Sequence, residues 1–199
     1  ETFSRYGVGP MAVQRGSIET QTFRFKILCG INKLYPGENL TILDYGCGLG
    51  DLFDYLRLHG FLGKYIGADI NENLINFAAK KYSKFQRAKF ICVNSEKDLK
   101  NLKYDYCLIS GVFNNKISGG RKILESVIKK VFKNCQRGVA FNALSNYAIK
   151  KDKNLAYFNP LAIMKFCLDT ITRFAVLRHD WRGGNFAIYL YKNKGAMNF

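Results

Sequence analysis

The sequence lacks the features typical of a membrane-spanning or metal-binding protein. Its 199 residues include only two histidines, and no apolar run approaches the roughly 20 residues that a membrane-spanning helix needs. The N-terminus does not have the layout of a signal peptide. The six cysteines form no CxxC pair and no paired His/Cys spacing; they stand at positions 29, 47, 92, 107, 135 and 167. We therefore expect free thiols, a reducing cytoplasmic setting and no bound metal.

Acidic residues are also scarce. The chain has 15 Asp and Glu against 31 Lys and Arg, a net charge of +16. This balance favours phosphate-rich or otherwise acidic partners, nucleic acid included. Alternatively, the lysines cover solvated helix faces, because they are spread along the chain rather than gathered in one run. The chain begins with Glu1 rather than Met, so we expect it to be trimmed or to be one domain of a longer protein.

What the sequence does contain is a regular alternation of strand and helix patterns. Strands are expected at 40–46, 64–70, 88–93, 104–110 and 138–144, and helices at 17–34, 51–58, 72–82, 120–133 and from about Pro160. Two more strand runs, 173–181 and 185–192, flank Gly183 and Gly184 and predict a β-hairpin. This order predicts an α/β fold with a doubly wound, mostly parallel seven-stranded sheet that ends in an antiparallel hairpin. Such sheets bind ligands beyond the carboxyl ends of their strands.

A glycine run follows the first expected strand, in "ILDYGCGLGD" at 42–51. Glycine lets a ligand approach the backbone closely, and the start of the next helix favours a carboxylate-bearing group. A dinucleotide site would have glycine at position 51, but Asp51 stands there and would repel a pyrophosphate. Asp69 ends the second strand, where an acid binds ribose hydroxyls; the alternative is that it caps the helix beginning near Glu72.

"ILDYGCGLGD" together with "YIGADI" resembles motifs I and II of the class I S-adenosylmethionine (SAM)-dependent methyltransferases, and the resemblance covers nearly the whole chain. Other stretches, among them "SGVFNN" and "VLRHDW", are similar to a bacterial branch of that superfamily whose substrate is not settled. The resemblance implies a Rossmann-like methyltransferase fold and SAM as the cofactor. The cofactor-binding residues that it implies are Asp44, Gly46, Cys47, Gly48, Gly50, Asp69, Ile70, Asn94, Ser95, Ser110 and Gly111.

The flanking segments are expected to complete the site. We expect one methyltransferase domain over 1–199, with 1–37 as a helical cap and 145–158 as a substrate loop. In the cap, Gln21 and Arg24 fit a polar face opposite Phe23 and Ile27, and Arg24 would pair with the cofactor's methionine carboxylate. The alternative is that Arg24 is an ordinary surface arginine.

Few side chains are suited to act as a general base. His179 stands near the end of the sixth strand and could reach the rim of the site, although a packed edge-strand histidine is the alternative. Tyr6 and Tyr147 are further catalytic candidates.

The expected function is O- or N-methylation of a small molecule or sugar-like acceptor, because 199 residues leave no room for an appended recognition domain. One alternative is an RNA methyltransferase, which the net charge supports, although "SGVF" is not the motif with which amino-directed base methylases hold a flipped base. Another is a catalytically silent cofactor-binding subunit. The acceptor atom and the oligomeric state stay open.

Overall fold

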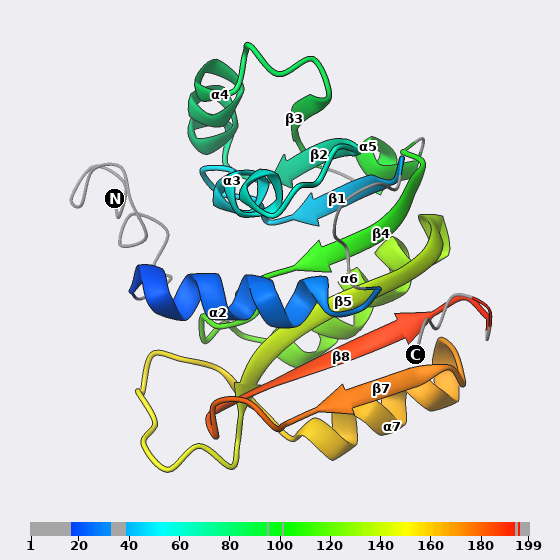
Figure 1. Ribbon diagram of the computed structural model, residues 1–199. Coiled ribbons are helices and arrows are strands. Elements are labelled where there is room, and N and C mark those ends of the chain that lie inside the picture. The colour runs from blue at the N-terminus through cyan, green and yellow to red at the C-terminus, as the bar shows by residue number, and fades with distance from the viewer. Residues whose placement is uncertain (1–16, 33–38, 95, 101, 194, 196–199) are drawn as a thin grey trace.

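The computed structural model describes residues 17–32, 39–94, 96–100, 102–193 and 195, and Figure 1 shows their arrangement. The helices are α2 (Ile18–Cys29), α3 (Asp51–Leu58), α4 (Glu72–Lys81), α5 (Glu96–Lys100), α6 (Gly120–Asn134) and α7 (Pro160–Thr170). The strands are β1 (Thr41–Tyr45), β2 (Lys64–Asp69), β3 (Ala88–Cys92), β4 (Tyr104–Ile109), β5 (Cys135–Ser145), β6 (Tyr157–Phe158), β7 (Ala175–Arg178) and β8 (Asn185–Tyr191).

One sheet contains all of these strands, in the order β3-β2-β1-β4-β5-β8-β7, with β6 paired to β5. The pairs among β1 to β6 are parallel, whereas β8 is antiparallel to both β5 and β7. The predicted mostly parallel sheet with an antiparallel C-terminal hairpin is confirmed. It has eight strands rather than seven, because Tyr157 and Phe158 pair with Leu144 and Ser145 inside the expected loop.

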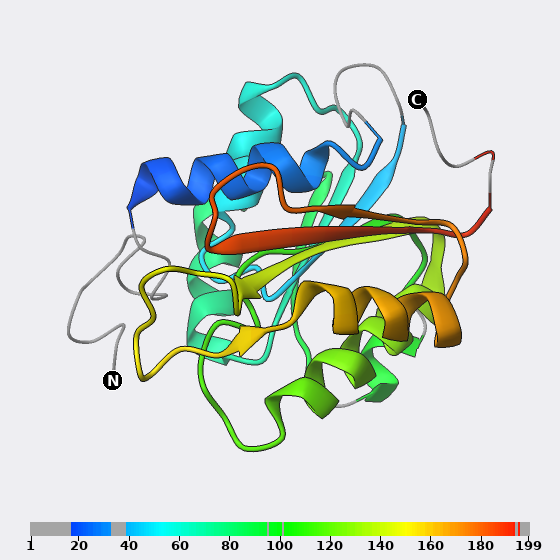
Figure 2. The same ribbon diagram turned by 90° about the horizontal axis from the view of Figure 1, so that it is seen from below.

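Helices cover both faces of this sheet, with α2 and α3 on one side and α6 and α7 on the other (Figures 1 and 2). Successive side chains of a strand point to opposite faces, so each strand supplies both layers of the core. In β1, Ile42 belongs to the cluster under α2, α3 and α4, and Leu43 to the cluster under α5, α6 and α7. Among the described residues, no helix combines the length and apolar character that a membrane crossing requires.

Helix α2 begins where the sequence predicts, but it presents a different face. Ser17 caps it by accepting a hydrogen bond from the backbone N–H of Thr20. The alternative of an ordinary surface arginine is wrong, because Arg24 is about 4% exposed and Gln21 about 5%, whereas Phe23, expected on the opposite apolar face, is 37% exposed. Positions 21, 24 and 28 lie on one side of a helix, so the side that buries Leu28 against the sheet also buries the two polar residues.

The topology brings several strand ends to one edge of the sheet. The carboxyl ends of β1 to β5 share that edge because these strands are parallel. Strand β7 is antiparallel to β8, which is antiparallel to β5, so β7 also ends there. This edge therefore gathers the glycine turn, Asp69 and His179, although they are far apart in the sequence.

Candidate functional site

The turn between β1 and α3 requires glycine for two separate reasons. Gly46, Gly48 and Gly50 have φ of 77°, 56° and 80°, in the left-handed region that favours glycine. A Cβ on Gly46 would overlap the side chain of Val112, and one on Gly50 would lie 2.6 Å from Cε2 of Tyr82. The turn is thus tightly packed from both sides and has a single backbone shape.

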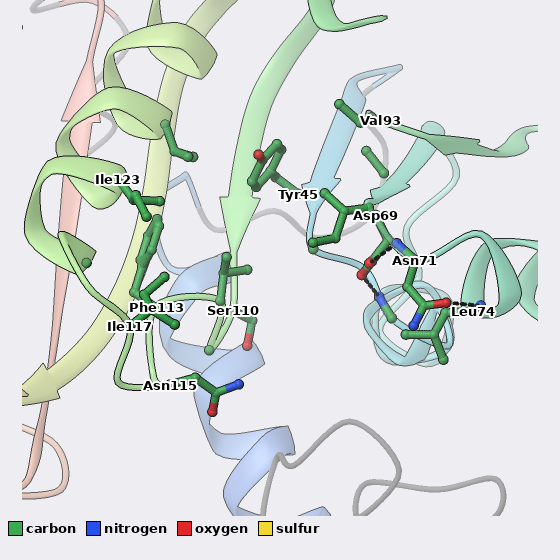
Figure 3. Close-up of a pocket in the computed structure, with 18 residues that line it drawn as sticks. Tyr45, Asp69, Asn71, Leu74, Val93, Ser110, Phe113, Asn115, Ile117 and Ile123 are labelled. Atoms are coloured by element: carbon green, nitrogen blue, oxygen red, sulfur yellow. Dashed lines mark hydrogen bonds between the residues drawn. The ribbon is translucent and has the colours of Figure 1, made fainter. Parts of the chain in front are cut away.

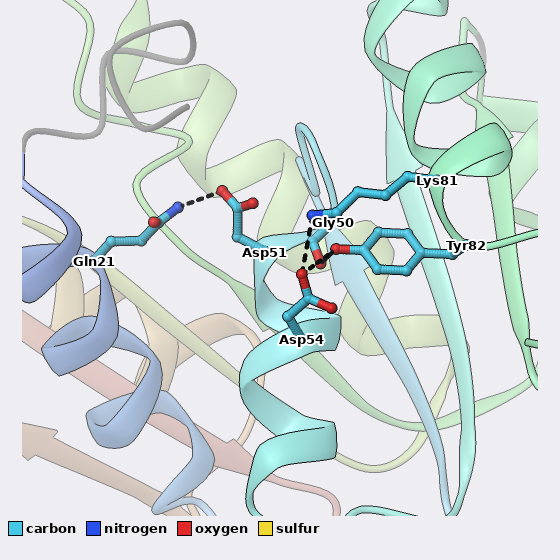
Figure 4. A network of polar contacts seen from close by, with 6 residues as sticks. All are labelled: Gln21, Gly50, Asp51, Asp54, Lys81 and Tyr82. Atoms are coloured by element: carbon cyan, nitrogen blue, oxygen red, sulfur yellow. Dashed lines mark hydrogen bonds and ion pairs between the residues drawn. The ribbon is translucent and has the colours of Figure 1, made fainter. Parts of the chain in front are cut away.

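Polar contacts from neighbouring helices brace this turn (Figure 4). The hydroxyl of Tyr82 shares its one proton between the carboxylate of Asp54 at 2.6 Å and the carbonyl of Gly50 at 3.1 Å. Burial and the hydrogen bond to Asp54 raise the pKa of the Tyr82 phenol well above its usual value, so it remains a donor. The side chain of Gln21 donates to Asp51 at 2.9 Å, so Asp51 ties α3 to α2.

Asp69 connects the end of β2 to the glycine turn (Figure 3). Its Oδ2 accepts from the backbone N–H of Gly48 and its Oδ1 from that of Asn71, both at 2.9 Å. The capping role considered for Asp69 belongs to Asn71, whose side chain accepts from the N–H groups of Asn73 and Leu74. Each carboxylate oxygen of Asp69 has accepted one backbone hydrogen bond, and this leaves acceptor capacity for two ligand hydroxyls.

A cavity of about 560 Å³ opens beside these groups. Gly46, Gly48, Asp69 and Asn71 form its polar side, and the loop after β4 forms another part of its wall. Its apolar lining includes Leu74, Val93, Phe113, Ile117, Ile123 and Val127. The volume lies in the range of small-molecule and cofactor sites. A carboxylate for ribose, apolar walls for a base and the backbone of Gly46 and Gly48 in the cavity wall fit a nucleoside-bearing cofactor such as SAM.

The cavity wall contains six of the predicted cofactor residues, namely Gly46, Gly48, Asp69, Ile70, Ser110 and Gly111. Others lie nearby in different surroundings. Asp44 is in the core, where it accepts from the hydroxyl of Tyr65 at 2.6 Å, and Cys47 is fully buried. Gly50 packs under Tyr82, and Asn94 is exposed, with its backbone N–H donated to Asp98. Ser95 and Tyr6 lie outside the described residues.

The two described catalytic candidates lie together. Nε2 of His179 is 3.0 Å from the hydroxyl of Ser145, which also accepts from the backbone N–H of Tyr147. The rings of His179 and Tyr147 meet edge to face, with centroids 6.0 Å apart. Neither side chain is part of the cavity wall. Tyr147 follows the end of β5 and His179 follows the end of β7, so the pair lies at the same edge of the sheet as the cavity but beside these two strands.

The expected substrate loop is partly ordered by pairing. Asn115 and Leu155 form an isolated antiparallel bridge. The N–H of Lys116 donates to the carbonyl of Asn154 at 3.0 Å, and that of Ala156 to the carbonyl of Asn114 at 2.8 Å. The loop is therefore held against residues 114–116, beside Phe113 and Asn115 in the cavity wall.

Sequence reasoning missed Asn142, whose Oδ1 accepts from the backbone N–H of Gly111 at 2.9 Å. A signal was present, since Asn142 is the polar residue within the apolar strand run "GVAFNAL". Among the described residues, Nδ2 of Asn142 and Oγ of Ser110 are buried without a hydrogen-bond partner. Leaving such a group unpaired costs about 1–3 kcal/mol, so buried unpaired groups next to a cavity indicate a ligand site.

Comparison with known proteins agrees with this geometry. The family model described as a methyltransferase domain matches residues 36–152. A Mycobacterium tuberculosis protein named as a methyltransferase, Rv1506c, is 30% identical over 161 residues, which cover 78% of this chain and 95% of that protein.

Solved structures share the fold. Magnesium protoporphyrin IX methyltransferase from Synechocystis PCC 6803, with bound SAM, has a TM-score of 0.65 at 18% identity, over 96% of this chain and 89% of that one. A SAM-dependent methyltransferase from Archaeoglobus fulgidus has a TM-score of 0.66 at 15% identity, over 89% of this chain and 96% of that one.

Proposed function

The chain belongs to the class I SAM-dependent methyltransferases, and from that premise we propose that it methylates an oxygen or nitrogen atom of a small or sugar-like acceptor. The observation that supports this most is the cavity at the carboxyl edge of β1 to β4, where the glycine turn and Asp69 meet. When bound, SAM supplies an electrophilic methyl carbon on its sulfonium, so the protein's task is binding and placement.

The proposed roles follow from the chemistry of the cavity wall. Asp69 accepts hydrogen bonds from the two ribose hydroxyls, because each of its oxygens retains acceptor capacity. Val93, Ile123 and Val127 give the adenine ring an apolar surface. The methionine end extends along the glycine turn toward α2, where the buried Arg24 is proposed to approach its carboxylate.

The acceptor is proposed to lie between the loop after β4 and the loop 145–158, which are joined by the Asn115–Leu155 bridge. His179 is proposed as the general base. In the tautomer whose Nε2–H donates to Ser145, Nδ1 is the free proton acceptor. An in-line attack needs the acceptor atom about 3 Å from the methyl carbon. The two loops are proposed to bind the acceptor and hold it at that distance.

An RNA acceptor is the second candidate, favoured by the net charge of +16. The two candidates are separated by incubating the protein with SAM labelled in its methyl group. One set of reactions contains nucleotide sugars and phenols, and the other contains mixed RNA. We expect label in the small-molecule fraction and none in acid-precipitable RNA. Label that enters RNA instead would contradict the proposed acceptor class and would leave the methyltransferase assignment intact.

A further inference from the structure

We infer that Asn142 is a positioning residue for the cofactor site: its side-chain amide, on β5, holds the loop after β4 in the shape that binds SAM. The inference rests on the proposed function for the identity of the ligand. Its structural part, the link between Asn142 and Gly111, stands on the geometry of the described residues.

The position of Asn142 makes it a bridge between two strands. The residue is fully buried in β5, between Phe141 and Ala143. Phe141 pairs in register with Ile109, the last residue of β4, so the chain leaves β4 directly beside Asn142. Oδ1 of Asn142 then accepts from the N–H of Gly111 at 2.9 Å. An N–H needs an acceptor, and only the amide oxygen can be one, so this bond also fixes which way the amide faces.

The bond acts on the part of the loop that lines the cavity. Gly111 has φ of 71°, a left-handed backbone that turns the chain sharply. On one side of it, the Ser110 hydroxyl is buried without a described partner, and on the other side Val112 packs against Gly46. Figure 3 shows Ser110 between Phe113 and Asp69. One hydrogen bond from β5 therefore holds the backbone of residues 110–112 in place. Because Val112 packs against Gly46, the same bond also supports the glycine turn.

The expected effect on binding follows from a population argument. Without the bond, the loop adopts other conformations, and the apparent dissociation constant rises by the inverse of the fraction that can still bind. Leaving the Gly111 N–H without its acceptor costs the binding shape about 1–3 kcal/mol, and a variant in which about one molecule in ten keeps that shape binds about tenfold more weakly. The loss should appear in SAM affinity together with faster hydrogen exchange at the Gly111 amide.

The test compares Asn142→Leu, which has a similar size and no acceptor, with Asn142→Asp, which keeps an oxygen for Gly111. SAM affinity is measured by calorimetry, and the Gly111 amide is followed by hydrogen exchange. We expect about tenfold weaker binding and faster Gly111 exchange for Asn142→Leu, and values within about threefold of wild type for Asn142→Asp.

Asn159→Leu is the matched control, because Asn159 uses its Oδ1 in the same way, toward the N–H groups of Leu161 and Ala162 at the start of α7. It should lower the melting temperature and leave SAM affinity unchanged. Wild-type SAM affinity in Asn142→Leu, or Gly111 exchange that does not change, would overturn the inference.

If Asn142→Leu does not fold, the wild type decides the matter. The inference requires the Gly111 amide to be protected before SAM is added, and fast exchange there would overturn it. Failure of the proposed function looks different: the wild type would not bind SAM at all, while Gly111 would still be protected.

Discussion

Replacing Asp69 with alanine should separate cofactor binding from fold stability. The carboxylate is expected to bind two ribose hydroxyls, and it accepts from the N–H groups of Gly48 and Asn71 in the protein itself. A hydrogen bond to a charged group contributes about 1.5–3 kcal/mol. Two such bonds at the lower end give about 3 kcal/mol, which is roughly a hundredfold increase in the dissociation constant. Asp69→Asn keeps one acceptor oxygen and should weaken binding about tenfold.

Asp69→Ala also removes the acceptors of the Gly48 and Asn71 backbone N–H groups, so the free energy of unfolding should fall by about 1–3 kcal/mol. Asp105→Ala is the control for that loss, because Asp105 also accepts from a backbone N–H, that of Thr41, at 2.8 Å. Asp105 lies at the amino end of β4, whereas the cavity lies at the carboxyl ends of the strands. Calorimetry with SAM and thermal melts of the variants measure both effects. If Asp69→Ala bound SAM within threefold of wild type, or if Asp105→Ala weakened binding equally, the reasoning would be refuted.

Three further predictions concern stability, catalysis and pH. Tyr82→Phe removes the donor to Gly50 and Asp54, and should lower stability by about 1–2 kcal/mol, a fall of roughly 2–8 °C in a thermal melt; an unchanged melt would show that the bracing of the turn is dispensable. His179→Ala should reduce kcat by at least about 100-fold and leave SAM affinity unchanged; an unchanged kcat would exclude His179 as the base. Burial raises the pKa of the Cys135 and Cys167 thiols from 9.0 to about 12. Above pH 9 these thiols ionise in the unfolded chain but stay protonated in the folded one, so the free energy of unfolding is unaffected below pH 9 and falls as the pH rises toward 12. The melting temperature of the wild type should therefore fall more between pH 9 and 10.5 than that of a double serine variant at these positions, and equal falls would contradict this.

The parts of the fold that depend on local patterns could be predicted from the sequence. The sheet and the start of α2 were predicted from strand and helix periodicity and from the capping residue Ser17. The glycine run predicted the edge of the sheet at which the cavity lies. On α2 the periodicity predicted the burial of Ile27 and Leu28 but not the exposure of Phe23, because docking on the sheet decides the edge of the buried face.

Contacts between distant residues were the other limit. The bond from Gly111 to Asn142 joins positions 31 apart in the sequence, and no local pattern reports such a pairing. Strand β6 is two residues long and exists only through its pairing with β5, so periodicity had nothing to detect. The place of Asp69 in the cavity wall was thus predictable, because one strand end supplies it, whereas the bond that two strands share was not.

The central claim is that the cavity at the carboxyl edge of β1 to β4 binds SAM. Calorimetric titration of the wild-type protein with SAM, with NAD⁺ titrated in parallel, tests it most directly. We predict one SAM bound per chain and no measurable binding of NAD⁺, because Asp51 stands where a dinucleotide site needs glycine. Binding of NAD⁺ in preference to SAM, or no binding of SAM, would contradict the account.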